Sequence, residues 1–233
     1  MTGSSPSPGS LGFKAGLPIA VSYLFISVAF GALAVETHLS PAEATLMSVL
    51  VFAGASQFMA LGMLKAGAGT LQIVLATLFI NLRHFIMSLA VHHRLDQDTP
   101  PRGRALLSFG ITDETFALLT LPTTSKVPLS SPAYALGLMG SAYAGWVGGT
   151  LLGSLGAQVI PSTLSSAMGV GLYALFIGLL IPHVRRSSTA RWVTGASMVL
   201  NALLAPLLGP GWAIVAATVC GASVGLLLPE DSP

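Results

Sequence analysis

The sequence predicts an all-α fold, a polytopic integral membrane helical bundle. Hydrophobic residues make up 53% of the 233 residues and charged residues only 8%, whereas soluble domains carry about 25% charged residues. Apolar segments long enough to cross a bilayer recur along nearly the whole chain, which favours several spanning helices over one anchored domain. No alternation of polar and apolar residues is sustained as the strands of a membrane barrel require.

We expect one transmembrane domain over residues 13–228. A disordered tail at residues 1–12 precedes it, and a short tail at residues 229–233 follows it. The first tail, MTGSSPSPGSLG, is rich in Ser, Pro and Gly and lacks the basic start of a signal peptide. The single cysteine, Cys220, lies in an apolar run and cannot form a disulfide within one chain.

Apolar segments joined by short connections divide this domain, and we expect about seven or eight of them. They cover residues 17–35, 42–64, 69–91, 105–121, 133–156, 167–182, 189–208 and 211–228. The fourth segment is near the lower length limit of a spanning helix and carries Asp113 and Glu114 at its centre. It is predicted to be a broken or re-entrant helix lining a cavity, because irregular backbone at membrane depth is tolerated only there.

Basic loops indicate the orientation of the chain in the membrane. Loop 92–104 and the loop around residues 185–191 both carry several arginines, so both are expected in the cytoplasm. Three apolar segments lie between them, whereas an even number of crossings is required. Either segment 105–121 does not cross fully, or segment 133–156 is broken at its central glycines. The two acids favour the first alternative.

Asn81, Arg83 and His84 interrupt the third apolar segment. An arginine at membrane depth costs roughly 2.5 to 3.5 kcal/mol, so function or pairing usually compensates it. Arg83 could extend to the cytoplasmic interface; alternatively, it pairs with an intramembrane acid or receives a substrate carboxylate. Asn81 and His84 share one helix face. His84 alone is more often a buried core histidine, but beside these residues it is a candidate for proton coupling.

Asp113 and Glu114 are the acids, among the eight in the chain, that we expect at membrane depth. Adjacent carboxylates face different directions on a helix, so they need separate partners. Arg83 is expected to pair with one of them, which leaves the other to bind a cation, a proton or a substrate ammonium. The alternative is that both lie in a loop at the membrane surface.

The string FAGASQF, residues 52–58, lies in the middle of the second segment. Small residues followed by Ser56 and Gln57 could mark a helix break near Gly54, where freed backbone N–H groups meet an anionic ligand group. Gln57 could equally hydrogen-bond a neighbouring helix.

Enzyme motifs are absent from the sequence. It has neither a P-loop nor an HExxH zinc motif, and its serines and histidines lack the pattern of an intramembrane serine protease. We therefore expect no enzyme and invoke no cofactor or metal.

Three ordered motifs carry a family resemblance: FAGASQF (52–58), NLRH (81–84) and TDET (112–115). With GLPIAVSYLFISVAFG (16–31) and YALFIGLLIP (173–182), they resemble the AzlC-type large subunit of branched-chain amino-acid exporters. An acid often seen in that family before the ALFI string is replaced here by Gly169, Val170 or Gly171. The resemblance implies efflux of valine, leucine, isoleucine or similar amino acids across the cytoplasmic membrane. It also implies a small AzlD-type membrane subunit of about four helices as partner.

The predicted function is export of branched-chain or related amino acids, with proton coupling as a further hypothesis. Arg83 and the Gly54 region would bind the substrate carboxylate, an acid its ammonium, and apolar side chains the rest. The alternative is an uncoupled channel or a structural membrane subunit for ions or small neutral solutes. The predicted substrate-binding residues are Gly54, Ser56, Gln57, Asn81, Arg83, Asp113 and Glu114, and the predicted proton-coupling residues are His84, Asp113 and Glu114.

Overall fold

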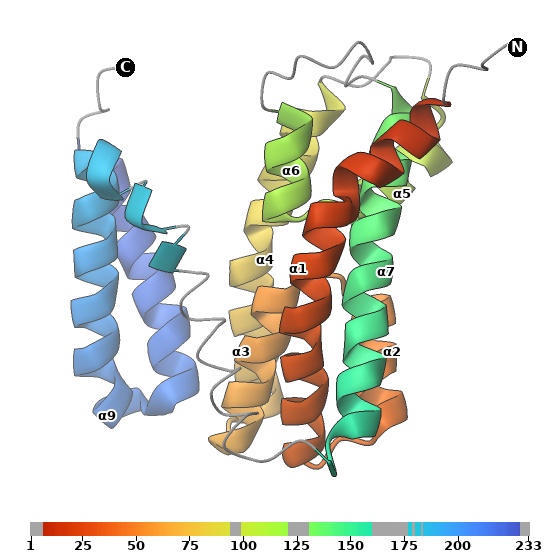
Figure 1. The fold of residues 1–233 in the computed structure, drawn as a ribbon. Coiled ribbons are helices and arrows are strands. Elements are labelled where there is room, and N and C mark those ends of the chain that lie inside the picture. The colour runs from red at the N-terminus through yellow and green to blue at the C-terminus, as the bar shows by residue number, and fades with distance from the viewer. Residues whose placement is uncertain are drawn as a thin grey trace, which may run out of the picture. The chain divides into compact units, whose positions relative to one another are not determined.

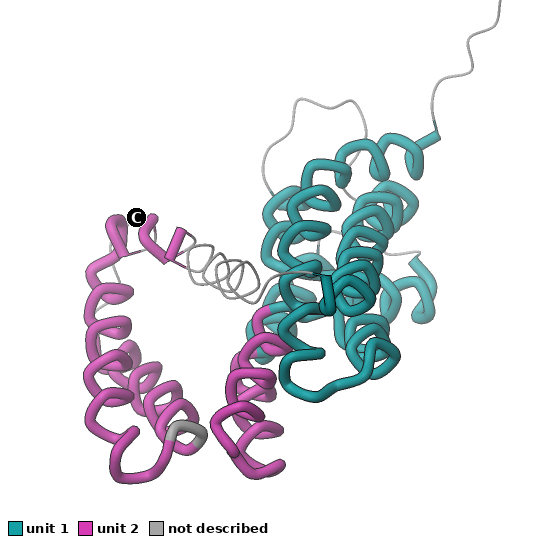
Figure 2. The backbone as a smooth tube through the Cα atoms, turned by 60° about the horizontal axis from the view of Figure 1, so that its bottom comes forward, with its two compact units in different colours: residues 1–54, 81–165 teal, residues 55–80, 166–233 magenta. Residues whose placement is uncertain are grey.

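The computed structural model describes residues 7–93, 99–120, 131–159, 177–178, 180–182 and 184–228. All regular structure in these residues is helical, which confirms the predicted fold class. The chain divides into two compact units (Figure 2). One comprises Met1–Gly54 and Asn81–Ser165; the other comprises Ala55–Ile80 and Ser166–Pro233.

Figure 1 shows the helices along the chain. They are α1 (Pro8–Glu36), α2 (Pro41–Leu50), α3 (Gly54–Lys65), α4 (Thr70–His92), α5 (Pro101–Phe109), α6 (Asp113–Thr120), α7 (Pro132–Gly156) and α9 (Ser188–Leu226). Local sequence fixes several starts: α1, α2, α5 and α7 each begin with proline, whose missing N–H is not needed there. The predicted tail at residues 1–12 is too long, because Ser7 caps α1 and Pro8 begins it.

Three of the described helices are long and apolar enough to cross a membrane: Pro8–Glu36, Thr70–His92 and Ser188–Gly209. Their exposed faces are apolar. On α1, Phe13, Leu17, Val21 and Phe25 recur every fourth residue and all are exposed. Such a continuous apolar stripe on the surface is expected of a helix that faces lipid. The chain is therefore a membrane protein.

Helices α1 and α7 form the centre of the first unit and run parallel. Glycines bring their backbones together, since an added Cβ at Gly12 would strike the Tyr134 carbonyl and one at Gly153 the Val28 carbonyl. Close backbone approach at small residues is how membrane helices gain packing energy. Helix α7 has no interruption, so the alternative of a break at the central glycines of segment 133–156 is wrong.

Two predicted apolar segments are each broken into two short helices. Segment 42–64 forms α2 and α3 with non-helical residues 51–53 between them, and segment 105–121 forms α5 and α6 with a break at residues 110–112. Helix α5 packs on α7, helix α6 packs on both α1 and α7, and both short helices lie toward the same end of the unit (Figure 1). Segment 105–121 therefore does not cross the first unit from end to end, as the acids in it predicted.

In the second unit, α9 folds back on itself at Gly209 (Figure 1), whose φ of 77° and ψ of 161° are non-helical. Gly221 in the second arm lies against Ser197 in the first. The predicted segments 189–208 and 211–228 are thus the two arms of one hairpin. Segment 167–182 lies mostly outside the described residues, as do the replaced acid position at 169–171 and the tail at 229–233.

Candidate functional site

The two helix breaks of the first unit lie next to each other. Phe52, in the break between α2 and α3, has its ring centroid 6.5 Å from that of Phe109, the last residue of α5. The Tyr143 ring of α7 contacts both, at 5.3 Å from Phe52 and 5.8 Å from Phe109. An aromatic cluster of Tyr23, Phe52, Phe109 and Tyr143 thus joins segments distant in sequence.

The carboxyl end of α2 is attached to α7 by hydrogen bonds. The last carbonyls of a helix lack partners within it and must find them elsewhere. The Tyr143 hydroxyl donates to the Val49 carbonyl at 2.9 Å. One residue earlier, the buried hydroxyls of Ser48 and Thr150 hydrogen-bond at 2.8 Å. These contacts fix the place where α2 stops.

Helix α3 begins against a tryptophan. A Cβ at Gly54 would lie 2.5 Å from Cη2 of Trp146, so only glycine allows this approach. The buried Trp146 ring also packs edge-on against Tyr23 at 5.4 Å. Gly54 therefore serves to place the first turn of α3 next to the aromatic cluster.

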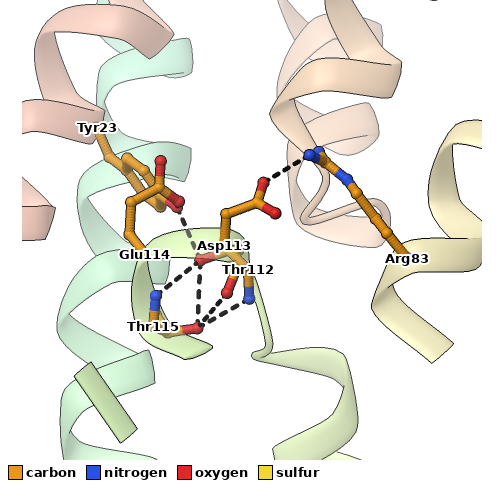
Figure 3. Close-up of polar contacts among 6 residues, drawn as sticks. All are labelled: Tyr23, Arg83, Thr112, Asp113, Glu114 and Thr115. Atoms are coloured by element: carbon orange, nitrogen blue, oxygen red, sulfur yellow. Dashed lines mark hydrogen bonds and ion pairs between the residues drawn. The ribbon is translucent and has the colours of Figure 1, made fainter. Parts of the chain in front are cut away.

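The first turn of α6 is held by two threonines. The backbone N–H of Thr112 donates to Thr115 Oγ1 at 2.8 Å, and that of Thr115 donates back to Thr112 Oγ1 at 3.3 Å (Figure 3). This reciprocal arrangement caps the helix in the way a capping box does. Thr115 also donates to the Gly110 carbonyl at 3.1 Å, so one buried side chain closes the whole break.

Asp113 and Glu114 leave this turn in different directions, toward different helices (Figure 3). Arg83 Nη1 of α4 lies 2.7 Å from Asp113 Oδ2, and the two side chains are 32% and 29% exposed. The Tyr23 hydroxyl of α1 donates to Glu114 Oε2 and lies 2.8 Å from Thr112 Oγ1. The predicted pairing of Arg83 with an acid is therefore present in the structure.

Arg83 keeps unused donors. A guanidinium carries five N–H donors and no acceptor. Its Nε is buried, and no group of the described residues accepts a hydrogen bond from it. Arg83 therefore has one buried N–H without an acceptor in the described part of the chain, in addition to its ion pair with Asp113.

The other predicted residues divide between the two units. Asn81 and His84 are half-buried on α4 beside Arg83, whereas Leu82, Phe85 and Ile86 form the exposed face of that helix. Gly54, Arg83, Asp113 and Glu114 belong to the first unit. Ser56 and Gln57 are buried in the part of α3 that belongs to the second. Their roles in binding and coupling stay predictions.

Sequence reasoning missed the tyrosines. Tyr23 and Tyr143 were not among the predicted residues, although each supplies a hydroxyl at a helix break. A signal was available, since both stand in otherwise apolar segments. Over the described ranges, no three His, Cys, Asp or Glu side chains gather as a metal site would require.

Comparison with known proteins agrees with the membrane architecture. Residues 18–160 match the family model described as AzlC protein. The inner membrane protein YgaZ of Escherichia coli is 32% identical over 95% of this chain and 93% of its own length. An uncharacterized membrane protein of Archaeoglobus fulgidus is 33% identical, covering 90% of this chain and 92% of its own length.

More distantly, the branched-chain amino acid transport protein AzlC of Bacillus subtilis is 25% identical over 71% of this chain and 63% of its own length. No solved structure matches the chain. The family match spans more than half of the sequence, and two relatives above 30% identity span nearly all of it. On these grounds the chain belongs to the AzlC family of membrane proteins.

Proposed function

We propose that this chain is a transporter that exports branched-chain or related amino acids across the cytoplasmic membrane. Its family and the name of the Bacillus subtilis relative support a role in amino-acid transport. The observation that carries the proposal is the Arg83–Asp113 ion pair, a third exposed and placed at a helix break. Intramembrane charges of this kind mark transport pathways.

A zwitterionic substrate can replace this ion pair with two new ones, one to each of its own charges. Its carboxylate binds the guanidinium of Arg83, which still has donors to offer. Its ammonium binds the carboxylate of Asp113, which loses Arg83 as partner at the same moment. Both protein charges remain compensated during the exchange, which matters because an unpaired charge in a low-dielectric site is costly.

Helix ends and aromatic rings supply the rest of the proposed site. The positive amino-terminal ends of α3 at Gly54 and of α6 at Asp113 favour a carboxylate nearby. The aromatic cluster beside both breaks offers an apolar surface to a branched side chain. Asn81 completes the proposed binding residues of the first unit as a hydrogen-bonding group, whereas the binding roles of Ser56 and Gln57 stay predictions from the sequence.

Export direction, proton coupling and the partner belong to this proposal. We infer that the chain works with a small AzlD-type subunit and that the proton-coupling group is one of His84, Asp113 and Glu114. The family resemblance supports the partner, and the concentration of ionisable groups on α4 and α6 supports coupling.

The proposal is tested by export from cells that express the chain with its partner and are fed dipeptides containing leucine, isoleucine or valine. Arg83→Ala and Asp113→Asn should each abolish efflux while the protein remains in the membrane. Arg102→Ala, an exposed arginine of α5, is the matched control and should export normally. Undiminished export by both site variants would refute the assignment.

A further inference from the structure

The two adjacent acids of α6 have partners of different chemistry, and this difference assigns them different tasks if the proposed transport function holds. Asp113 faces the Arg83 guanidinium at 2.7 Å. Glu114 faces the Tyr23 hydroxyl, which itself lies 2.8 Å from the Thr112 hydroxyl. Figure 3 shows the two carboxylates directed to opposite sides of the turn.

The partner of Asp113 tolerates one protonation state. A guanidinium only donates hydrogen bonds and stays charged in proteins. A protonated Asp113 would therefore lose the ion pair, and Arg83 would be left as an uncompensated charge among apolar helices. The ion pair with Arg83 requires the carboxylate form of Asp113, which is also the form that a substrate ammonium needs.

The partners of Glu114 tolerate both states. A tyrosine or threonine hydroxyl donates one hydrogen bond and also accepts. In the structure the Tyr23 hydroxyl donates to Glu114 Oε2, as it would to a carboxylate. When Glu114 gains a proton, its own O–H can donate to the Tyr23 oxygen, and the Tyr23 hydroxyl can turn to Thr112. The hydrogen bonds reverse without leaving a buried group unsatisfied.

Among the residues that the structure describes, few other titratable groups surround Glu114. Asp113 stands beside it on α6, with Arg83 and His84 beyond it on α4. Of the helices packed on α6, α1 presents Tyr23, and α7 carries tyrosines and no charged residue. A proton at Glu114 therefore changes the charge next to the Arg83–Asp113 pair from net negative to neutral.

We propose that Glu114 carries the coupled proton, that Asp113 and Arg83 hold the substrate, and that Tyr23 is the positioning residue between them. When the site faces outward, Glu114 takes a proton from the external medium. The loss of negative charge beside Asp113 weakens its hold on the substrate ammonium, and the amino acid leaves. When the site faces the cytoplasm, the proton dissociates from Glu114 and a new substrate binds.

The test uses the chain with its partner subunit, purified and reconstituted in lipid vesicles, with radiolabelled leucine. Exchange is measured at equal pH on both sides, and net transport is measured under an imposed pH gradient. Glu114→Gln should still exchange leucine at saturating concentration, with a weaker apparent affinity because the neutral amide resembles the protonated carboxyl. It should lose its response to the gradient, because the amide keeps the Tyr23 contact and has no proton that titrates. Asp113→Asn should lower the rate of leucine exchange about tenfold or more.

Tyr23→Phe tests the positioning role separately. It keeps the aromatic ring and should alter the pH profile of net transport, because Glu114 loses its hydroxyl partner, and it should reduce exchange at neutral pH less than Asp113→Asn does. Tyr134→Phe, at a buried tyrosine of α7, is the matched control and should keep the wild-type profile. A pH profile unchanged by Tyr23→Phe would contradict its assignment as the positioning residue.

Three outcomes would overturn the division of tasks. They are loss of exchange in Glu114→Gln as severe as in Asp113→Asn, a retained gradient response in Glu114→Gln, and wild-type exchange that ignores the pH gradient. The proposed function fails differently, namely if the wild-type protein moves no branched-chain amino acid in either assay. Melting temperatures in detergent show whether each variant is folded.

Discussion

The ring of Phe52 lies 6.5 Å from the ring of Phe109, so a residue within one helix break contacts the residue that precedes the other. Tyr143 of α7 packs against both rings. Each break exposes backbone N–H and C=O groups that a continuous helix would satisfy. Because the two breaks lie next to each other, these polar groups are concentrated at one place inside an apolar protein. Predictions for the residues that hold this place follow from their contacts.

Gly54→Ala should displace the first turn of α3. The added methyl would meet the Trp146 ring at 2.5 Å, and a rigid indole cannot move aside cheaply. We expect a loss of roughly 1–3 kcal/mol in stability, seen as a lower melting temperature in detergent, together with reduced transport. Gly62→Ala on the same helix is the control, because nothing lies within 4 Å of its Cβ position.

A second substitution separates this steric effect from any other role of Gly54. Trp146→Phe makes room at the ring, so the double variant with Gly54→Ala should recover part of the stability lost by Gly54→Ala alone. Strict additivity of the two losses would show that the indole contact is not the reason for glycine at this position.

Tyr143→Phe should loosen the end of α2. The ring contacts with Phe52 and Phe109 remain, but the Val49 carbonyl loses its 2.9 Å donor, which is worth about 1 kcal/mol. Because the helix break then has an unsatisfied carbonyl, amide hydrogen exchange in α2 should accelerate. Tyr143→Leu, which also removes the ring contacts, should be clearly worse; equal effects would mean that the hydroxyl contributes nothing.

The sequence predicted the charged residues that form contacts at the helix breaks better than the neutral ones. Arg83, Asp113 and Glu114 stood out because a charge at membrane depth needs compensation, and that need restricts its possible partners. Tyrosines also occur in membrane helices for other reasons. The hydroxyl partners of Tyr23 and Tyr143 depend on how α1 and α7 pack. Tertiary packing, which no local pattern encodes, decides which tyrosine reaches a helix break.

The sequence also did not predict which helices pack against each other. Glycines recur at three- to five-residue spacing in α7, a pattern typical of close helix packing in membranes, and Gly145, Gly149 and Gly153 lie against the α1 backbone. Gly140 belongs to the same series, yet nothing lies within 4 Å of its Cβ position. Spacing therefore indicates that a helix has a close neighbour, but neither which helix it is nor which glycines face it.

Gly153→Ala should separate α1 from α7. Its Cβ would overlap the Val28 carbonyl, and backbone cannot yield as a flexible side chain does. A loss of roughly 1–3 kcal/mol is expected, measured as a lower melting temperature in detergent. Gly140→Ala provides the matched control on the same helix and should be neutral or slightly stabilising, because alanine is the better helix former. Equal melting temperatures of the two variants would contradict the close contact between α1 and α7 at Gly153.

The Arg83–Asp113 pair allows stability and transport to be tested against each other. Arg83→Ala leaves the Asp113 carboxylate without its cation, and Asp113→Ala leaves the guanidinium without its anion. Because both side chains are about a third exposed, each single loss should cost roughly 1–3 kcal/mol, less than at a fully buried pair. Removing both charges leaves no uncompensated group, so the double alanine variant should melt closer to the wild type than either single variant.

Transport should not recover in the double alanine variant, although stability does. If the pair served only to hold α4 against α6, the double variant that regains stability would regain export as well. If the two charges bind the two ends of a zwitterion, the double variant should stay as inactive as the single ones, because both binding groups are gone. Melting temperature and dipeptide-fed export, measured on the same four proteins, therefore distinguish a structural ion pair from a substrate site. Export restored together with stability would reject the substrate role of Arg83 and Asp113.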